Sequence, residues 1–181
     1  SMTTEGSLRR HAKFTSEASK IIPAGESMLG MVGYCAHQFV LRDLVAKEPE
    51  LFAFTDREAI FHSLRKLHKV LKKKYHLQTR EWGDQPYESS QMNFCIANAG
   101  GIYEVDSYRE VFEVQRFWAI GSGSRYALGA MHGVFDRGGL GAKEIAEIGV
   151  RAAVEFDLYC GKPIESHALP KRFRIKANKV V

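Results

Sequence analysis

The sequence lacks the features that mark membrane proteins and secreted, disulfide-bonded proteins. No apolar run in its 181 residues approaches the roughly 20 residues that a bilayer-spanning helix needs. No hydrophobic leader is visible in the polar N-terminal segment. The three cysteines have no metal-type spacing, and an odd number of cysteines without a secretory signal favours reduced thiols. We therefore expect a cytoplasmic protein that binds no membrane.

Negative charge is nearly absent from one segment, residues 57–80. This segment contains eight Lys and Arg residues against Glu58, so its net charge of +7 exceeds the +5 of the whole chain. A basic segment of this kind is compatible with nucleic-acid binding. Its cations, however, lie on one face of an amphipathic helix and are not interleaved with aromatic side chains. We therefore expect a solvated surface and no nucleic-acid partner, with a basic nucleic-acid-binding module as the weaker alternative.

Internal repeats and low-complexity segments are also missing, and the length fits a single domain over residues 1–181. Apolar spacing and turn residues predict two strands, two helices, a run of strands, two more helices and a terminal strand. The predicted strands are 19–22, 28–32, 92–98, 102–106, 111–120 and 162–169, and the predicted helices are 34–46, 56–75, 124–135 and 142–159. This order indicates an α+β fold of two packed sheets with helices outside both.

The most informative turn is Gly121-Ser122-Gly123, which joins an apolar strand to a helix rich in small residues. Its glycines allow the backbone to bend tightly, and the Ser122 hydroxyl is left at a strand end beside a helix N-terminus. Many strand-to-helix junctions use glycine for geometry alone. The chemical meaning of this turn therefore depends on the motifs around it.

Four motifs occur in a fixed order along the chain. They are Met31-Val-Gly-Tyr-Cys-Ala-His-Gln38, Trp118-Ala-Ile-Gly-Ser-Gly-Ser-Arg-Tyr-Ala127, Ala142-Lys-Glu-Ile-Ala-Glu-Ile148 and Asp157-Leu-Tyr-Cys-Gly161. Together they resemble the N-terminal-nucleophile (Ntn) hydrolases of the proteasome β type, including the bacterial HslV-type peptidase, from Thr3 to Leu169. The resemblance implies a four-layer αββα sandwich and a threonine peptidase that cleaves peptide bonds inside a self-compartmentalising oligomer.

In that family an N-terminal Thr attacks the scissile carbonyl, its α-amine serves as the base, and a nearby lysine lowers the pKa of the pair. The resemblance assigns these roles to Lys20 as the lysine, Gly33 N–H as the oxyanion donor, Ser122 as a hydrogen-bond partner near the α-amine, and Asp157 as the helix-end carboxylate. Cys160 stands where the family has serine. Plainer interpretations are an exposed lysine, turn residues, a solvated carboxylate and a small buried thiol.

The family's first strand, which carries the nucleophile, precedes the segment that aligns with Ser1. Thr3 does not replace it, because only 17 positions separate Thr3 from Lys20, too few for the hairpin that brings the family's pair together. Two alternatives follow: an active peptidase whose first strand lies upstream of Ser1, or a non-catalytic structural ring subunit. The resemblance further implies peptide or unfolded-protein substrates and a homo-oligomeric ring, and it allows for a separate ATP-dependent unfoldase.

Neither a metal nor a cofactor is expected. His62, His68 and His76 lie on or near one predicted helix, but their separations of six and eight residues differ from the i, i+4 spacing of helical metal ligands. We interpret these side chains as surface histidines.

Overall fold

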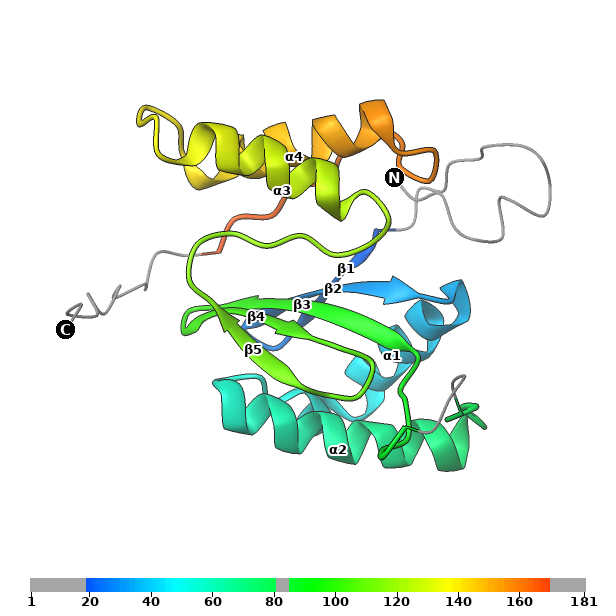
Figure 1. Ribbon diagram of the computed structural model, residues 1–181. Coiled ribbons are helices and arrows are strands. Elements are labelled where there is room, and N and C mark those ends of the chain that lie inside the picture. The colour runs from blue at the N-terminus through cyan, green and yellow to red at the C-terminus, as the bar shows by residue number, and fades with distance from the viewer. Residues whose placement is uncertain (1–18, 81–84, 170–181) are drawn as a thin grey trace.

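The computed structural model describes residues 19–80 and 85–169, which form one five-stranded antiparallel sheet with helices on both sides (Figure 1). The strands are adjacent in sequence order: β1 (Ile21–Ala24), β2 (Ser27–Gly33), β3 (Met92–Asn98), β4 (Gly101–Val105) and β5 (Val111–Val114). The helices are α1 (Cys35–Lys47), α2 (Arg57–Lys74), α3 (Ser124–Phe135) and α4 (Ala142–Phe156), with a short 3-10 helix, η2 (Pro49–Phe52). Helices α1 and α2 cover one face of the sheet, and α3 and α4 lie over the other (Figure 1).

The larger hydrophobic core lies between the sheet and the α1–α2 layer. Leu29 pairs with Ile96 across β2 and β3, and Met31 pairs with Phe94, so that alternate side chains of both strands point into this core. Helix α2 completes it with one apolar face, made of Ile60, Leu64, Leu67 and Leu71. Asp56 is the N-cap of this helix, because its carboxylate accepts a 2.9 Å hydrogen bond from the backbone N–H of Ala59.

A smaller core joins α3 to α4 and brings their backbones close together. Its buried members on α4 are Ile145, Gly149 and Ala153, spaced four residues apart. A Cβ on Gly149 would lie 2.8 Å from Met131 Cγ of α3, so glycine permits the close approach. Helical spacing of apolar residues favours a buried stripe of Ile145, Ile148, Ala152 and Phe156 on α4, but of its two ends only Ile145 is buried and Phe156 is 66% exposed. Phe39, an apolar residue at helical spacing in α1, is likewise 72% exposed.

Two predicted strands differ from the structure for a common reason, the lack of a pairing partner. The strand expected over 111–120 ends at Val114, which pairs with Ile102. The partner strand β4 begins at Gly101, one residue before Ile102, so it offers no further residues with which a longer β5 could pair. The extended segment 162–169 forms no strand with any part of the chain that the structure describes.

The last predicted helix also ends earlier than expected, at Phe156 rather than at residue 159. Asp157 leaves the helical conformation (φ −102°, ψ 126°), and its side chain accepts a hydrogen bond from the backbone N–H of Tyr159 at 2.7 Å. This local bond competes with the helix. None of the helices within the described ranges is long and apolar enough to cross a membrane.

Candidate active site

The turn at residues 121–123 has the tight geometry expected from its glycines. Gly121 adopts φ +97°, a conformation that L side chains rarely tolerate. The Gly121 carbonyl accepts a 3.1 Å hydrogen bond from the Ser124 N–H, and the Gly123 carbonyl accepts one of 3.1 Å from the Ala127 N–H. The turn therefore leads directly into α3 and holds Ser122 at the N-terminal end of that helix.

The same turn packs against the end of α4. A Cβ on Gly123 would lie 2.7 Å from both Ala153 Cβ and Cys160 Sγ, so only glycine fits without a shift of its neighbours. This contact brings the Ser122 hydroxyl to Asp157, to whose Oδ1 it donates a hydrogen bond of 3.2 Å. Because Gly123 has no side chain, the turn packs closely against the end of α4. Ser122 and Asp157, which lie 35 positions apart, can therefore form a hydrogen bond.

Asp157 connects the residues at the end of α4. Its Oδ1 accepts from both Ser122 Oγ and the Tyr159 N–H, and its carbonyl oxygen accepts a 3.1 Å bond from the Cys160 N–H. Burial raises the pKa of the Cys160 thiol, as does the adjacent Asp157 carboxylate. The thiol is therefore neutral at physiological pH.

Lys20, immediately before β1, lies within electrostatic reach of this cluster. Its pKa is lowered by burial, and the opposing effects come from the thiols of Cys160 and Cys35. A partly desolvated lysine gives up its proton more readily than a solvated one. Lys20, Ser122, Asp157 and Cys160, from two ends of the chain, are hereafter called the Lys20 cluster.

Gly33, the predicted oxyanion donor, ends β2. Its φ is +146°, and a Cβ at this position would lie 2.9 Å from the carbonyl oxygen of Gln91, so the backbone requires glycine. The preceding residue, Val32, places Cγ1 3.1 Å from where a Cβ on Gly121 would stand. Gly33 is therefore next to a residue in contact with the 121–123 turn, while the oxyanion role of its N–H stays a prediction.

Two neighbours of these residues were missed by sequence reasoning. Cys35, the first residue of α1, lies close enough to Lys20 to affect its pKa. His37 places Nδ1 3.4 Å from a Cβ built on Gly33, and this buried nitrogen has no hydrogen-bond partner among the described atoms. Burial lowers the pKa of His37. The sequence spacing of Cys35 and His37 gives no sign that they lie near Lys20 and Gly33.

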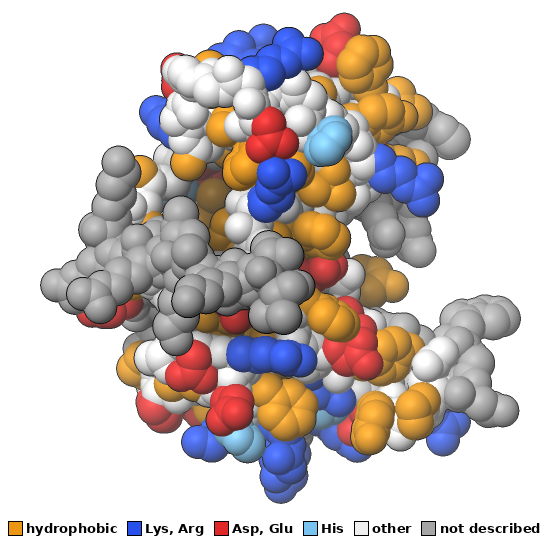
Figure 2. All heavy atoms as spheres, turned by 60° about the vertical axis from the view of Figure 1, so that its left-hand side comes forward, with side chains coloured by type: hydrophobic (Ala, Val, Ile, Leu, Met, Phe, Trp, Pro, Cys, Tyr) orange, Lys and Arg blue, Asp and Glu red, His pale blue; other side chains and the backbone are white. Residues whose placement is uncertain are grey.

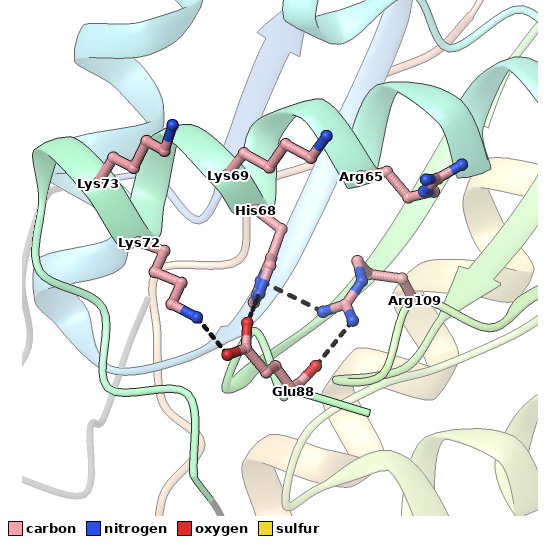
Figure 3. Close-up of a pocket in the computed structure, with 7 residues that line it drawn as sticks. All are labelled: Arg65, His68, Lys69, Lys72, Lys73, Glu88 and Arg109. Atoms are coloured by element: carbon pink, nitrogen blue, oxygen red, sulfur yellow. Dashed lines mark hydrogen bonds and ion pairs between the residues drawn. The ribbon is translucent and has the colours of Figure 1, made fainter. Parts of the chain in front are cut away.

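The interpretation of His68 as a surface histidine is wrong. Its side chain is only 8% exposed, with Nδ1 3.0 Å from Ser90 Oγ and Nε2 3.2 Å from Glu88 Oε2 (Figure 3). The Nδ1 atom also lies 3.2 Å from Nη1 of Arg109. Burial lowers the pKa of His68, and the neutral ring can donate from Nε2 to Glu88 while Nδ1 accepts. Hydrogen bonds from Lys72 and His68 lower the pKa of the Glu88 carboxyl to about 2.

No group of three His, Cys, Asp or Glu side chains within residues 19–80 and 85–169 is arranged to hold a metal ion. Thr3, rejected above as a nucleophile, lies outside the described residues.

The chain is similar to known proteins over most of its length. The family model described as "Proteasome subunit" matches residues 2–165. Two structures of BPH from Thiobacillus denitrificans are each 36% identical to the chain. The match covers 83% of this chain and 78% of BPH with a TM-score of 0.75 in one. In the second, a complex with epoxomicin, it covers 81% and 76% with a TM-score of 0.71. HslV from Trypanosoma brucei is 21% identical over 85% of this chain and 82% of its own, with a TM-score of 0.62, and shows likeness in fold. No curated protein matches the chain.

Proposed function

Because the chain belongs to the proteasome subunit family, we propose that it forms the body of a threonine-type peptidase. The enzyme would hydrolyse peptide bonds in peptides or unfolded proteins inside a closed ring of identical subunits. The observation that carries this proposal is the Ser122–Asp157 hydrogen bond at the 121–123 turn, with Lys20 in electrostatic interaction with the neighbouring Cys160. A partly buried lysine beside a hydroxyl–carboxylate pair is an environment that can tune the pKa of a nearby amine.

In the proposed reaction the nucleophile is an N-terminal Thr that the printed sequence does not contain. Its hydroxyl oxygen adds to the carbonyl carbon of the scissile bond while the hydroxyl proton passes to the α-amine. The resulting ammonium protonates the departing amine as the C–N bond breaks, which leaves an ester on the Thr. Water then adds to the ester carbonyl with the amine again accepting a proton, and the acid product leaves as the Thr hydroxyl is restored.

The residues of the cluster have separate roles in this scheme. The positive charge of Lys20 favours the neutral form of the nearby α-amine and so lowers its pKa. Ser122, itself held by Asp157, offers its oxygen to the N–H groups of the amine and orients it. The N–H of Gly33 donates to the oxyanion that forms in each tetrahedral intermediate. All three act on charges or protons that change during the reaction.

The finer architecture is also part of the proposal. One face of the sheet packs on α1 and α2, while residues on its other face, including Gly30, Cys95 and Glu104, are partly exposed. We place a second sheet between this face and the α3–α4 layer, which gives the four-layer αββα sandwich of a single cytoplasmic domain over 1–181. Exposed apolar side chains on and after α3 and α4 support assembly into rings; they are Tyr126, Val150, Phe156 and Leu158. A separate ATP-dependent unfoldase would supply unfolded chains.

A non-catalytic ring subunit is the second candidate function. The observation in its favour is Cys160, whose thiol donates hydrogen bonds more weakly than the serine of the family. Such a subunit would keep the same fold and assembly surface without turnover.

The test uses the full-length protein with its native N-terminus. Intact-mass measurement should find a chain that begins with Thr, and that chain should cleave a small fluorogenic peptide. Lys20→Ala should lower kcat at least about 100-fold, the lower range for a group that assists proton transfer. Lys143→Ala, which removes an exposed lysine of α4, is the matched control and should retain full activity. Epoxomicin, the ligand of one BPH structure, should inhibit the parent enzyme.

Two results would reject the peptidase and favour the structural subunit. One is a full-length chain without an N-terminal Thr, and the other is turnover that Lys20→Ala leaves unchanged. Size-exclusion chromatography with light scattering should show the same ring for both variants, so that a loss of activity is not a loss of assembly.

A further inference from the structure

A groove with mostly positive walls lies along α2 (Figure 3). Helix α2 is on the side of the sheet opposite α3 and α4 (Figure 1). Its volume is about 480 Å³, and it is lined by Arg65, His68, Lys69, Lys72, Lys73, Glu88 and Arg109. Figure 2 shows basic side chains gathered along the lower edge of the molecule, where α2 lies. We propose that this groove binds a small oligophosphate, a ligand with two or more linked phosphates, and that Arg65 and Arg109 are its principal contacts.

The cations of the groove come from two sides. Arg65, Lys69 and Lys73 lie at successive i, i+4 positions of α2 and therefore share one helix face, with neighbours roughly 6 Å apart. Arg109 belongs to the loop between β4 and β5 and approaches the same helix, as Figure 3 shows. A ligand between them would be held from both walls, which a flat basic surface does not offer.

Three of these cations have no carboxylate partner among the described residues. Within the described ranges, no carboxylate lies within ion-pair distance of Arg65, Lys69 or Lys73. Glu88, the one carboxylate among the described lining residues, is already paired with Lys72 and accepts from His68. The groove thus has an excess of positive charge that its own acidic residue does not offset.

Arg109 is held in place before any ligand arrives. Its backbone has φ +70°, which is unusual for a residue other than glycine. The Asp106 side chain fixes this loop, since its Oδ1 accepts hydrogen bonds of 2.9 Å from the N–H groups of both Tyr108 and Glu110. Backbone strain that is maintained by its surroundings is found preferentially at functional sites.

The guanidinium of Arg109 is fixed as well. Nη1 donates to Ser90 Oγ at 2.8 Å, and Nη2 donates to the Glu88 carbonyl at 2.7 Å. With the contact to His68 Nδ1 these use at most three of its five N–H groups, so two remain for a ligand. Ser90 and His68, which are 4% and 8% exposed, are positioning residues that keep the Arg109 guanidinium in one orientation.

Arg65 and Arg109 lie close enough to repel each other. The pKa of Arg109 is lowered mainly by burial, and the positive charge of Arg65 lowers it further. Two like charges held near one another across a groove are relieved by a ligand with several negative charges. Binding of a multivalent anion would therefore be favoured over binding of a single chloride or monocarboxylate.

The shape and lining of the groove indicate which anion fits. Its volume is within the range of small-ligand sites, roughly 300–1,000 Å³. Guanidinium forks match phosphate oxygens in pairs, and lysines supply additional point charges. None of the seven lining residues that the structure describes is aromatic, so these residues offer no stacking surface for a base. These features favour a compact chain of phosphates.

The experiment is isothermal titration calorimetry of the purified full chain with sodium triphosphate at fixed ionic strength. Triphosphate should bind, and citrate of similar charge should bind at least about 10-fold more weakly. Arg65→Gln and Arg109→Gln should each weaken triphosphate binding at least about 10-fold, the effect of losing one charge-assisted contact of about 1.4 kcal/mol. Arg125→Gln, which removes an exposed arginine on α3, is the matched control and should bind like the parent protein.

Arg65→Gln keeps the proposal testable if Arg109→Gln fails to fold, because the Arg65 side chain is exposed and makes only a ring contact with Phe61 at 5.8 Å among the described residues. Equal binding by the parent protein and Arg65→Gln would overturn the proposal. Equal or tighter binding of citrate, an acidic peptide or a single-stranded oligonucleotide would overturn it too, since each points to a different ligand class.

Discussion

Replacing Gly123 with alanine tests how closely the 121–123 turn must approach α4. The added Cβ would lie 2.7 Å from Ala153 Cβ and 2.7 Å from Cys160 Sγ. Carbon atoms reach their optimum separation at about 3.5–4.0 Å, so each contact is short by about 1 Å. Ala153 has no rotamer that moves its Cβ away, because this atom is fixed by the α4 backbone. The helix or the turn must therefore shift.

The expected cost is about 2 kcal/mol of unfolding free energy. Overpacking a core typically costs about 1–3 kcal/mol, and two simultaneous contacts, one of them with a fixed atom, place this case in the upper half. Against this, the backbone angle of Gly123 (φ −79°) is open to alanine, and the substitution reduces the entropy of the unfolded chain by about 0.4–1 kcal/mol. The steric term is the larger of the two.

A second glycine of the same helix provides the control. A Cβ on Gly129 meets no atom within 4 Å, so Gly129→Ala should stabilise the protein by about 0.5–1 kcal/mol through helix propensity alone. Urea unfolding followed by circular dichroism, at one protein concentration, measures both variants. Combining Gly123→Ala with Cys160→Ala should recover part of the loss, because one of the two contacts is removed. A Gly123→Ala protein as stable as its parent would refute the reasoning.

Two further predictions concern buried polar groups. Asn98→Ala should lower the free energy of unfolding by about 2–3 kcal/mol in the same urea assay. The buried Asn98 amide donates a hydrogen bond to the Phe54 carbonyl, and its oxygen accepts hydrogen bonds from the N–H groups of Gly100 and Gly101. A change below about 0.5 kcal/mol would contradict this. His68→Gln should flatten the pH dependence of stability between pH 7.5 and 5.5. The folded-state pKa of His68 is lowered by burial, so the unfolded chain binds more protons and the parent loses stability as pH falls below about 6.5. An unchanged slope would show that His68 does not titrate differently on unfolding.

Most of the element order follows from the sequence because it rests on local patterns. The spacing of Leu64, Leu67 and Leu71 predicts the buried face of α2, and all three are buried. The acidic N-cap and the small-residue helix after Ser122 are likewise local features and are confirmed. Strand lengths depend instead on partners far away in the chain. The end of β5 is set by where β4 ends, which no pattern within residues 111–120 records.

The candidate site is predictable only in part for the same reason. The motifs single out Lys20, Ser122 and Asp157 as candidates. The structure joins Ser122 to Asp157 by a hydrogen bond and places Lys20 within electrostatic reach of Cys160, while the catalytic roles stay predictions. The groove on α2 has no comparable motif. His68, Glu88 and Arg109 meet across separations of 20 and 41 residues, and the positive φ of Arg109 is a property of its loop. A histidine on an amphipathic helix therefore resembles a surface residue until its neighbours are known.

The cysteine at position 160 supports the non-catalytic ring subunit less than a comparison of side chains implies, because the charges of the Lys20 cluster do not depend on it. Burial and the Asp157 carboxylate raise the pKa of the thiol, so the thiol adds no charge to the cluster. Replacing a serine hydroxyl by a neutral thiol weakens one hydrogen bond and leaves this charge arrangement intact. The Ser122–Asp157 bond does not require the thiol either. Whether the protein is a peptidase or a structural subunit is therefore decided by the nucleophile, and Cys160 gives the structural subunit only weak support.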